Sequence, residues 1–386
     1  MVVAFVAIPA SLSVAYVEQA SPPPSAPPIV ERDVAYGTSG GAPLLLDVYR
    51  PSGVPADTPL PAVLLVHGGG WLAGSKAAVE REGVALAARG FVAFGIEYDM
   101  VTLPHWPTEL ENIQLSLRWV QDNATTYHVD VNRIGVFGGS AGGNLAMLLG
   151  TDGPGAPNYQ PVRAVVSWSG PADLRTLAVT VMTQGQVTRA SSLPDDARPV
   201  SCDGNPNCFA MLVPDLLIEY LSCGYNRCPL TYLAASPAAK VSSTTPPMYL
   251  AGSQQDFVPM DQNFQMANAL NDNGIRSVIQ YVEGNRHADA YYDLAIEPSI
   301  EFLTSALAPG ADPRVAPRSP PTTIAGSAEL PPVTDGWKLP ASTPPPPWIL
   351  LAGIVAGLLV VVLAAVGIRR RRHRRNDRGT SVTDTA

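Results

Sequence analysis

Residues 133–144 read Arg133-Ile134-Gly135-Val136-Phe137-Gly138-Gly139-Ser140-Ala141-Gly142-Gly143-Asn144. The apolar residues before Gly138 predict a short buried strand, and the Leu-, Ala- and Met-rich residues 145–149 predict a helix. Between the two lies G-x-S-x-G, with Ser140 at its centre. Glycines two residues before and after Ser140 allow a very tight turn, which exposes the hydroxyl at the carboxyl end of the strand. A Gly-rich turn without chemistry is the alternative, so partners for Ser140 must be sought elsewhere in the chain.

Strand and helix patterns alternate on both sides of Ser140. After an opening hairpin formed by 34–36 and 44–49, strands are predicted at 62–66, 91–96, 162–168, 248–252 and 278–282, and helices at 77–89, 109–127, 260–270 and 288–307. The run at 62–66 is apolar throughout, which is typical of a strand buried on both faces. The alternation predicts an α/β fold with a mostly parallel central sheet and helices on both faces.

Residues 173–240 interrupt this alternation. They lie between two predicted strands and are rich in Ser and Pro, with an apolar run at 211–221. An insertion at this point is expected to lie over the carboxyl edge of the sheet, as a lid above Ser140. A surface excursion far from the site is the alternative.

All four cysteines of the chain fall inside this insertion, at Cys202, Cys208, Cys223 and Cys228. Their spacings fit short zinc-binding motifs poorly. Two small disulfides fit better, with Cys202–Cys208 and Cys223–Cys228 as one of three possible connectivities, and buried free thiols are the alternative. Disulfides indicate an oxidising compartment.

The two ends of the chain predict attachment to a membrane. Residues 1–20 are similar to a signal peptide or signal anchor that lacks the usual basic start, and 21–29 form a Pro-rich spacer. Residues 309–347 are a Pro-rich stalk, and 348–368 contain no charge and are long enough to span a bilayer as a helix. The basic tail at 369–386 would stay cytoplasmic, which places the preceding domain, 30–308, on the extracytoplasmic side of the cell membrane.

The charge distribution excludes nucleic acid as a partner of the main domain. The formal net charge is -8, but residues 369–386 alone carry seven Arg and two Asp. Residues 1–368 therefore carry about -13, which would repel a phosphate backbone.

A serine nucleophile needs a base and an acid that orients the base. The histidines are His67, His105, His128, His287 and His373. His287 alone follows the last predicted strand, in a loop that leads to the carboxyl edge of the sheet, so it is the candidate base. Asp256 follows the strand at 248–252 and is the candidate acid, with a helix N-cap as its alternative role. Asp261 is second choice, because it lies inside the following helix.

Donors for an oxyanion are predicted in His67-Gly68-Gly69-Gly70-Trp71, which follows the strand at 62–66. Glycines let backbone N–H groups approach a reacting carbonyl oxygen, because no Cβ blocks them. The N–H groups of Gly68, Gly69 and Ala141 are the candidate oxyanion hole. A phosphate-binding loop is disfavoured, since no Gly-Lys-Ser or Gly-Lys-Thr follows.

These motifs and their order resemble the α/β-hydrolase superfamily over roughly residues 30–308. Within it, HGGGW at 67–71 and GGSAGG at 138–143 are most similar to the hormone-sensitive-lipase-like and BD-FAE-like carboxylesterases. The resemblance implies an α/β-hydrolase fold that needs no metal or cofactor.

The sequence therefore predicts a membrane-anchored serine carboxylesterase. Ser140, His287 and Asp256 would hydrolyse small carboxylic esters through an acyl-enzyme. The acyl and alcohol groups and the oligomeric state stay open. A prolyl-oligopeptidase-like serine peptidase and a catalytically inactive surface binding module are the alternatives.

Overall fold

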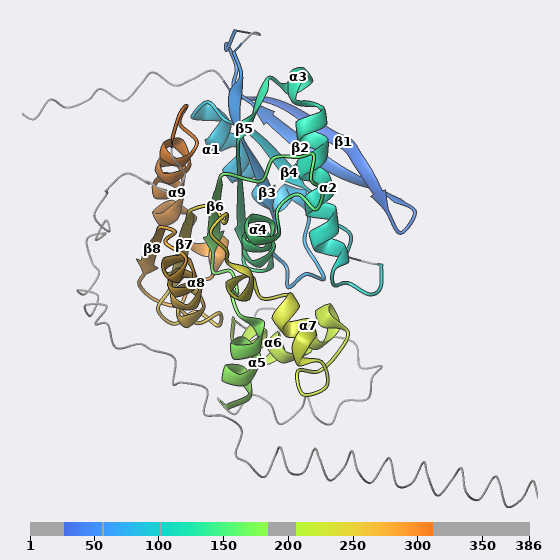
Figure 1. The fold of residues 1–386 in the computed structure, drawn as a ribbon, viewed down its shortest axis with the longest axis vertical. Coiled ribbons are helices and arrows are strands. Elements are labelled where there is room, and N and C mark those ends of the chain that lie inside the picture. Colours follow the sequence, from blue (N-terminus) through green and yellow to red (C-terminus); the bar gives the residue numbers. More distant parts are fainter. Residues whose placement is uncertain (1–26, 56–57, 101, 184–205, 312–386) are drawn as a thin grey trace, which may run out of the picture. The chain divides into compact units, whose positions relative to one another are not determined.

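The fold is given by a computed structural model, which describes residues 27–55, 58–100, 102–183 and 206–311. Its centre is an eight-stranded sheet with the strand order β1-β2-β4-β3-β5-β6-β7-β8 (Figure 1). The strands are β1 (Ile29–Ser39), β2 (Ala42–Arg50), β3 (Leu60–Val66), β4 (Val92–Ile96), β5 (Val129–Gly139), β6 (Ala164–Trp168), β7 (Met248–Ser253) and β8 (Ser277–Val282). From β4 to β8 all neighbours are parallel, whereas β2 runs antiparallel to both β1 and β4. The predicted mostly parallel α/β sheet is confirmed.

The apolar run at β3 occupies the middle of the sheet because it has core on both sides. Leu64 and Val66 belong to one buried cluster, whereas Val63 and Leu65 belong to another, and all four are fully buried. Burying one such side chain stabilises the fold by roughly 1.5–3 kcal/mol. The absence of polar residues in this strand is thus explained by its two buried faces.

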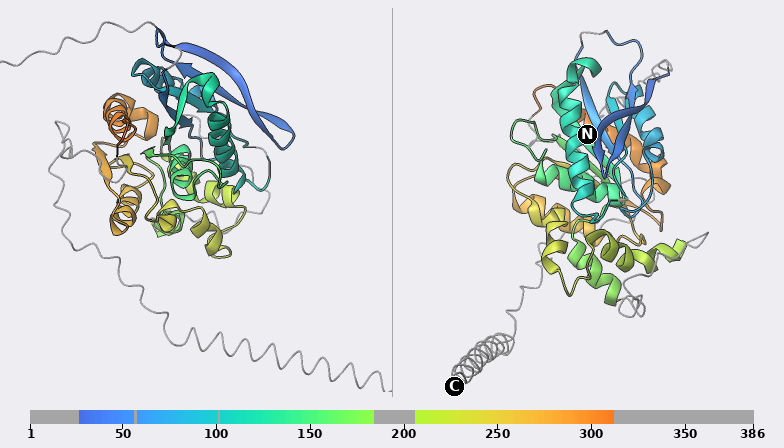
Figure 2. Two further views of the ribbon diagram at one scale, coloured as in Figure 1. Left: turned by 45° about the horizontal axis from the view of Figure 1, so that its top comes forward. Right: turned by 90° about the vertical axis from the view of Figure 1, so that its right-hand side faces the viewer.

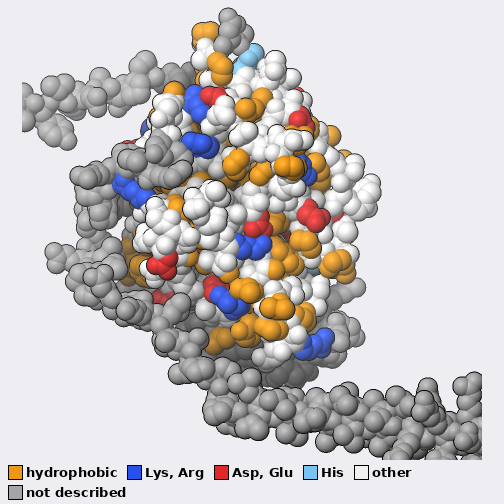
Figure 3. Space-filling model, in the orientation of Figure 1, with side chains coloured by type: hydrophobic (Ala, Val, Ile, Leu, Met, Phe, Trp, Pro, Cys, Tyr) orange, Lys and Arg blue, Asp and Glu red, His pale blue; other side chains and the backbone are white. Residues whose placement is uncertain are grey.

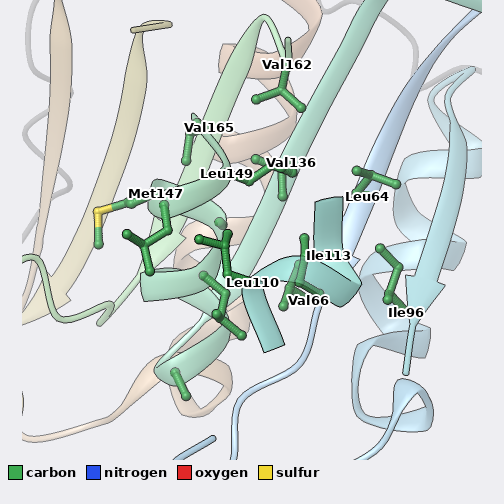
Figure 4. Close-up of a cluster of buried hydrophobic side chains, with 14 of the residues drawn as sticks. Leu64, Val66, Ile96, Leu110, Ile113, Val136, Met147, Leu149, Val162 and Val165 are labelled. Atoms are coloured by element: carbon green, nitrogen blue, oxygen red, sulfur yellow. The ribbon is translucent and has the colours of Figure 1, made fainter. Parts of the chain in front are cut away.

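Helices cover both faces of the sheet (Figure 2). One face carries α2 (Thr108–Asp122), α4 (Ala141–Asp152) and α8 (Asp261–Asp272), whose apolar residues share a cluster with Leu64. Figure 4 shows Leu110 and Ile113 of α2 and Met147 of α4 in this cluster. The other face carries α1 (Glu80–Ala88) and α9 (Tyr292–Ala306). Short 3-10 turns, η1 (Lys76–Val79) and η3 (Ala288–Tyr291), precede α1 and α9.

The helix predicted over 109–127 is divided into two pieces. α2 ends at Asp122, and a short helix, α3 (Ala124–Tyr127), follows. The Asn123 side chain donates a hydrogen bond to the Trp119 carbonyl at 2.8 Å, and His128 then takes a left-handed conformation with φ 56°. A side chain that competes for helix carbonyls in this way ends the regular helix.

The insertion between β6 and β7 is largely helical where it is described. It contains α5 (Leu174–Thr183), α6 (Pro206–Leu221), α7 (Pro229–Ala234) and η2 (Pro237–Lys240). Hydrophobic side chains gather in the lower part of the face shown in Figure 3, where Figure 1 draws these helices. Leu230 of α7 is 76% exposed. Residues 184–205, which include Cys202, lie outside the described residues.

The membrane-spanning part of the predicted fold class is corrected. A span needs about 20 apolar residues in one helix. Among the described residues α6 is the longest helix, with 16, and none is both long and apolar enough to cross a bilayer. The predicted segments 1–20, 348–368 and 369–386 lie outside the described residues. The single-pass membrane localisation rested on that helix and is withdrawn with it.

Candidate active site

Ser140 occupies a strained corner between β5 and α4. Its backbone has φ 55° and ψ -124°, a conformation that costs a non-glycine residue roughly 1–3 kcal/mol. The two flanking glycines make the corner possible. A Cβ on Gly138 would lie 2.2 Å from the Gly142 carbonyl oxygen, and a Cβ on Gly142 would lie 2.1 Å from the Val66 carbonyl oxygen. Only glycine fits at either position, so the G-x-S-x-G pattern has a direct steric cause.

The corner is fixed from two sides. The Ser140 N–H donates to the Trp168 carbonyl of β6 at 2.7 Å, and the Ser140 carbonyl accepts from the Asn144 N–H in the first turn of α4. Ala141 is the first residue of α4, so its N–H has no acceptor within the helix. The positive end of the helix dipole lies at this same point, which favours a developing negative charge.

His287 and Asp256 meet through a direct hydrogen bond. The Nδ1–H of His287 donates to Oδ1 of Asp256 at 2.8 Å, and the same oxygen accepts the Val258 N–H at 3.1 Å. The Asp256 side chain is fully buried, whereas that of His287 is 22% exposed. With Nδ1 occupied by the acid, the neutral imidazole presents Nε2 as its free basic atom.

The loop that carries His287 is held against the end of β7. The Ser253 hydroxyl donates to the Arg286 carbonyl, and the Gln255 N–H donates to the Gly284 carbonyl at 2.8 Å. The Phe257 ring lies against the imidazole with 4.0 Å between centroids. These contacts limit the rotation of His287.

The structure brings the His287 loop beside the Ser140 corner. A Cβ on Gly139 would lie 3.3 Å from the Ala288 Cβ and 3.2 Å from Oδ1 of Asp289. The residue before Ser140 and the two residues after His287 are therefore neighbours. Among the described residues, Nε2 of His287 is buried and makes no hydrogen bond, so none joins it to the Ser140 hydroxyl. Such bonds are often long in free enzymes and tighten when substrate binds.

The oxyanion loop, residues 67–71, lies next to Ser140. A Cβ on Gly68 would be 3.2 Å from the Ser140 Cβ and 3.0 Å from the Gly139 carbonyl oxygen. The Nδ1–H of His67 donates to the Gly68 carbonyl at 2.7 Å. Because a trans peptide points its C=O and its N–H in opposite directions, this bond turns the Gly69 N–H away from His67. Burial lowers the pKa of His67, which keeps the ring neutral.

Trp71 ties the oxyanion loop to the helix behind Ser140. Its Nε1–H donates to Oδ1 of Asn144 at 3.2 Å. The Asn144 amide donates in turn to the carbonyls of Pro171 and Ala235, at 2.9 and 3.3 Å. Asn144 is fully buried and thereby joins four segments that are distant in sequence.

The described part of the insertion contacts the oxyanion loop directly. A Cβ on Gly70 would lie 3.1 Å from the Leu216 side chain of α6, and the Tyr220 ring stacks on Trp71 with 4.4 Å between centroids. A disulfide joins Cys223 and Cys228 just after α6. That predicted pair is confirmed, whereas the pair with Cys202 lies outside the described residues.

Sequence reasoning missed the roles of Asn144, Trp71 and Tyr220. Both Asn144 and Trp71 stand next to a Gly-rich motif, which was the available signal. Nothing local to Tyr220 points to the site, because its partner Trp71 lies far away in the sequence. Among the described residues, no cluster of three or more His, Cys, Asp or Glu side chains is arranged to hold a metal ion.

Comparisons with known proteins find relatives that are named as esterases. Residues 46–201 match the BD-FAE family model. Esterase LipC of Mycobacterium tuberculosis is 28% identical over 65% of this chain and 57% of its own length, and Esterase LipQ of the same organism is 26% identical over 66% and 56%. The chain spans just over half the length of these relatives.

Solved structures show the same fold. A truncated carbohydrate esterase from gut microbiota superposes with a TM-score of 0.58 at 21% identity, over 74% of this chain and 97% of the other. The Thermogutta terrifontis esterase Est2, with propionate bound, gives a TM-score of 0.54 at 22% identity, over 73% and 94%. Together with the family match and the curated relatives, these likenesses confirm the predicted resemblance. The chain is thus similar to esterases of the α/β-hydrolase superfamily.

Proposed function

We propose that this protein is a serine carboxylesterase that hydrolyses small carboxylic esters, with Ser140, His287 and Asp256 as its catalytic triad. The observation that carries the proposal is the 2.8 Å hydrogen bond between His287 and the buried Asp256, on a loop packed against the strained Ser140 corner. The family relatives named as esterases support the same reaction class.

The first half of the reaction forms an acyl-enzyme. Oγ of Ser140 attacks the ester carbonyl carbon while Nε2 of His287 accepts the hydroxyl proton. The carbonyl oxygen becomes an oxyanion that accepts hydrogen bonds from the N–H groups of Gly68, Gly69 and Ala141. One such donor is worth about 2.7–4 kcal/mol of barrier. The tetrahedral intermediate collapses, and the alcohol leaves with the proton from His287.

The second half repeats these steps with water. His287 takes a proton from water, the hydroxide attacks the acyl carbon, and the intermediate collapses to release the carboxylic acid. The proton on His287 returns to Oγ of Ser140. Asp256 keeps Nδ1 of His287 protonated throughout and stabilises the imidazolium, so the basic Nε2 faces the reacting atoms.

The domain that performs this reaction is proposed to run from residue 30 to residue 308, with residues 173–240 as its lid. The support is the contact of α6 with the oxyanion loop, through Leu216 against Gly70 and Tyr220 on Trp71. In that position the insertion would limit the size of the ester that enters.

The test is hydrolysis of p-nitrophenyl acetate and butyrate together with labelling by a fluorophosphonate probe. Ser140→Ala should lower kcat by at least about 10³-fold and abolish labelling. Ser242→Ala, at an exposed serine, is the matched control and should retain both. Full hydrolysis by Ser140→Ala would refute the mechanism, and a wild-type protein that neither hydrolyses nor reacts with the probe would indicate a binding module instead.

A further inference from the structure

Glu109, near the start of α2, is a buried carboxyl group that the proposed reaction does not use. Its side chain is fully buried, and neither carboxyl oxygen makes a well-directed hydrogen bond within the described residues. The nearest titratable partner is His105, whose Nδ1 lies 3.2 Å from Oε1 of Glu109. His105 is itself only 4% exposed. A pair this deeply buried is costly to hold as two separate charges.

The groups around the pair favour uncharged forms of both members. Burial raises the pKa of Glu109 to about 8, and the nearby charge of Asp99 also raises it. The backbone N–H of Glu109 has the opposite effect and lowers this pKa. Burial also lowers the pKa of His105, although Glu219 and Asp99 oppose that effect. Both pKa shifts favour the uncharged carboxylic acid beside a neutral imidazole, with 3.2 Å between Oε1 and Nδ1.

Among the described residues, the charge of Glu109 also acts on two tyrosines, Tyr98 after β4 and Tyr220 of α6. Both are buried, and burial raises the pKa of each far above the neutral range, with the Glu109 charge adding to the effect. They therefore stay protonated while Glu109 titrates. A charge on Glu109 would face two neutral rings and the acidic Asp99.

A chain of contacts links this pair to the oxyanion loop. Trp106 directly follows His105, and its backbone N–H donates to the Tyr220 carbonyl at 3.1 Å. The Trp106 and Tyr220 rings meet edge to face at 5.9 Å, and Tyr220 stacks on Trp71 at 4.4 Å. His105 and Trp106 are thus connected through Tyr220 to Trp71, the last residue of the oxyanion loop.

A second route reaches the loop from its other end. The Tyr98 ring stacks on His67 with 4.3 Å between centroids, and its hydroxyl donates to the His67 carbonyl at 3.1 Å. His67 in turn holds the Gly68 carbonyl. Tyr98 and Tyr220 thus support the two ends of the loop.

We propose that Glu109 is a positioning residue for the oxyanion loop: in its uncharged form it stays buried against His105 and leaves Tyr220 stacked on Trp71, and its ionisation loosens the loop. An ionised carboxylate without partners must gain water or leave its site. Either movement displaces His105 and Trp106, and so shifts the N–H groups of the loop. The inference rests on the proposed esterase function, since the position of the oxyanion loop is measured through the rate of ester hydrolysis.

The experiment measures kcat and KM for p-nitrophenyl butyrate from about pH 6 to about pH 10, on the full chain. The wild type should lose about tenfold in kcat with a midpoint near the Glu109 pKa of about 8, with little change in KM, because the loop acts on the transition state. Glu109→Gln has nearly the same shape but cannot ionise, so its kcat should stay level through this range. A wild-type kcat that stays level to pH 10 would overturn the proposal.

Glu82→Gln is the matched control. Glu82 is a second buried carboxyl group with a raised pKa, on α1 at the opposite face of the sheet, and this variant should keep the alkaline loss of kcat. The same loss in Glu109→Gln would overturn the proposal. If Glu109→Gln does not fold, the proposal is tested by near-UV circular dichroism of the wild type over the same pH range. Aromatic signals that change with the midpoint of kcat support the proposal, and unchanged signals overturn it. Normal probe labelling of Ser140 at pH 7 separates this failure from a failure of the esterase function.

Discussion

Asn144→Ala tests whether the oxyanion loop is held from behind, as the structure indicates. Asn144 is fully buried and makes three side-chain hydrogen bonds, one accepted from Trp71 and two donated to the carbonyls of Pro171 and Ala235. Alanine removes all three and leaves an indole N–H and two carbonyls without these partners. This one substitution removes bonds that join the oxyanion loop, the segment after β6 and the insertion to α4.

The expected cost follows from those three groups. Each buried polar group that loses its partner costs about 1–3 kcal/mol, so the free energy of unfolding should fall by roughly 3–5 kcal/mol if the site relaxes in part. In a domain of this size 1 kcal/mol lowers Tm by about 2–4 °C, which gives a decrease of roughly 6–20 °C. Loss of the Trp71 anchor should also lower kcat by about tenfold or more, because the loop donors are displaced.

The assay is urea unfolding followed by tryptophan fluorescence, with esterase kinetics on the same samples. Asn273→Ala is the control, because Asn273 makes one exposed side-chain hydrogen bond, to the Ala269 carbonyl at 2.9 Å, at the end of α8. Its cost should stay within about 0.5–1 kcal/mol. If Asn144→Ala costs no more than the control and retains kcat, the reasoning about a shared anchor is wrong.

Three further outcomes are expected. Asp256→Asn should lower kcat by about 10³–10⁴-fold with the fold intact, because the amide favours the wrong tautomer of His287. Steady-state kinetics and circular dichroism check this, and a loss below tenfold contradicts the role of the acid. Gly68→Ala places a Cβ 3.0 Å from a backbone oxygen of the Ser140 corner and should lower kcat, whereas Gly224→Ala, which meets nothing within 4 Å, should not; equal kcat in both variants would count against the oxyanion loop. Burial raises the pKa of Glu82 to about 7 from 4.5, so between these values the folded state keeps a proton that the unfolded state has lost. The wild type should therefore lose stability between pH 5 and pH 7 relative to Glu82→Gln, by up to about 1.4 kcal/mol per pH unit. Urea unfolding at several pH values measures this. If the free energies of unfolding of the two proteins change in parallel with pH, the idea is mistaken.

Much of the fold could be predicted because each strand or helix has a local cause. The fully apolar run of β3 requires two buried faces, and the glycines around Ser140 are the only residues that the corner admits. The candidate base and acid were found by their positions after predicted strands. The membrane helix is the prediction that was wrong. It was read from hydropathy at 348–368, and no helix of the described residues can span a bilayer.

The parts that escaped prediction depend on side chains from distant segments. Asn144 and Trp71 are 73 positions apart, and the hydrogen bond between them exists only once β3 and β5 are neighbours in the sheet. Glu109 looks like an ordinary polar residue near the start of an amphipathic helix. Its burial is set by the folded chain, and no local pattern encodes it.

By itself, the sequence determined the α/β-hydrolase sheet, the Ser140 corner and the loops that carry Asp256 and His287, since these follow from apolar periodicity and from steric limits that act within a few residues. Only the tertiary structure decided which side chains support the site. Hydrogen bonds and ring stacking act over a few ångströms, so the contacts of Asn144, Tyr220 and Glu109 are set by which elements pack together and not by their order in the chain.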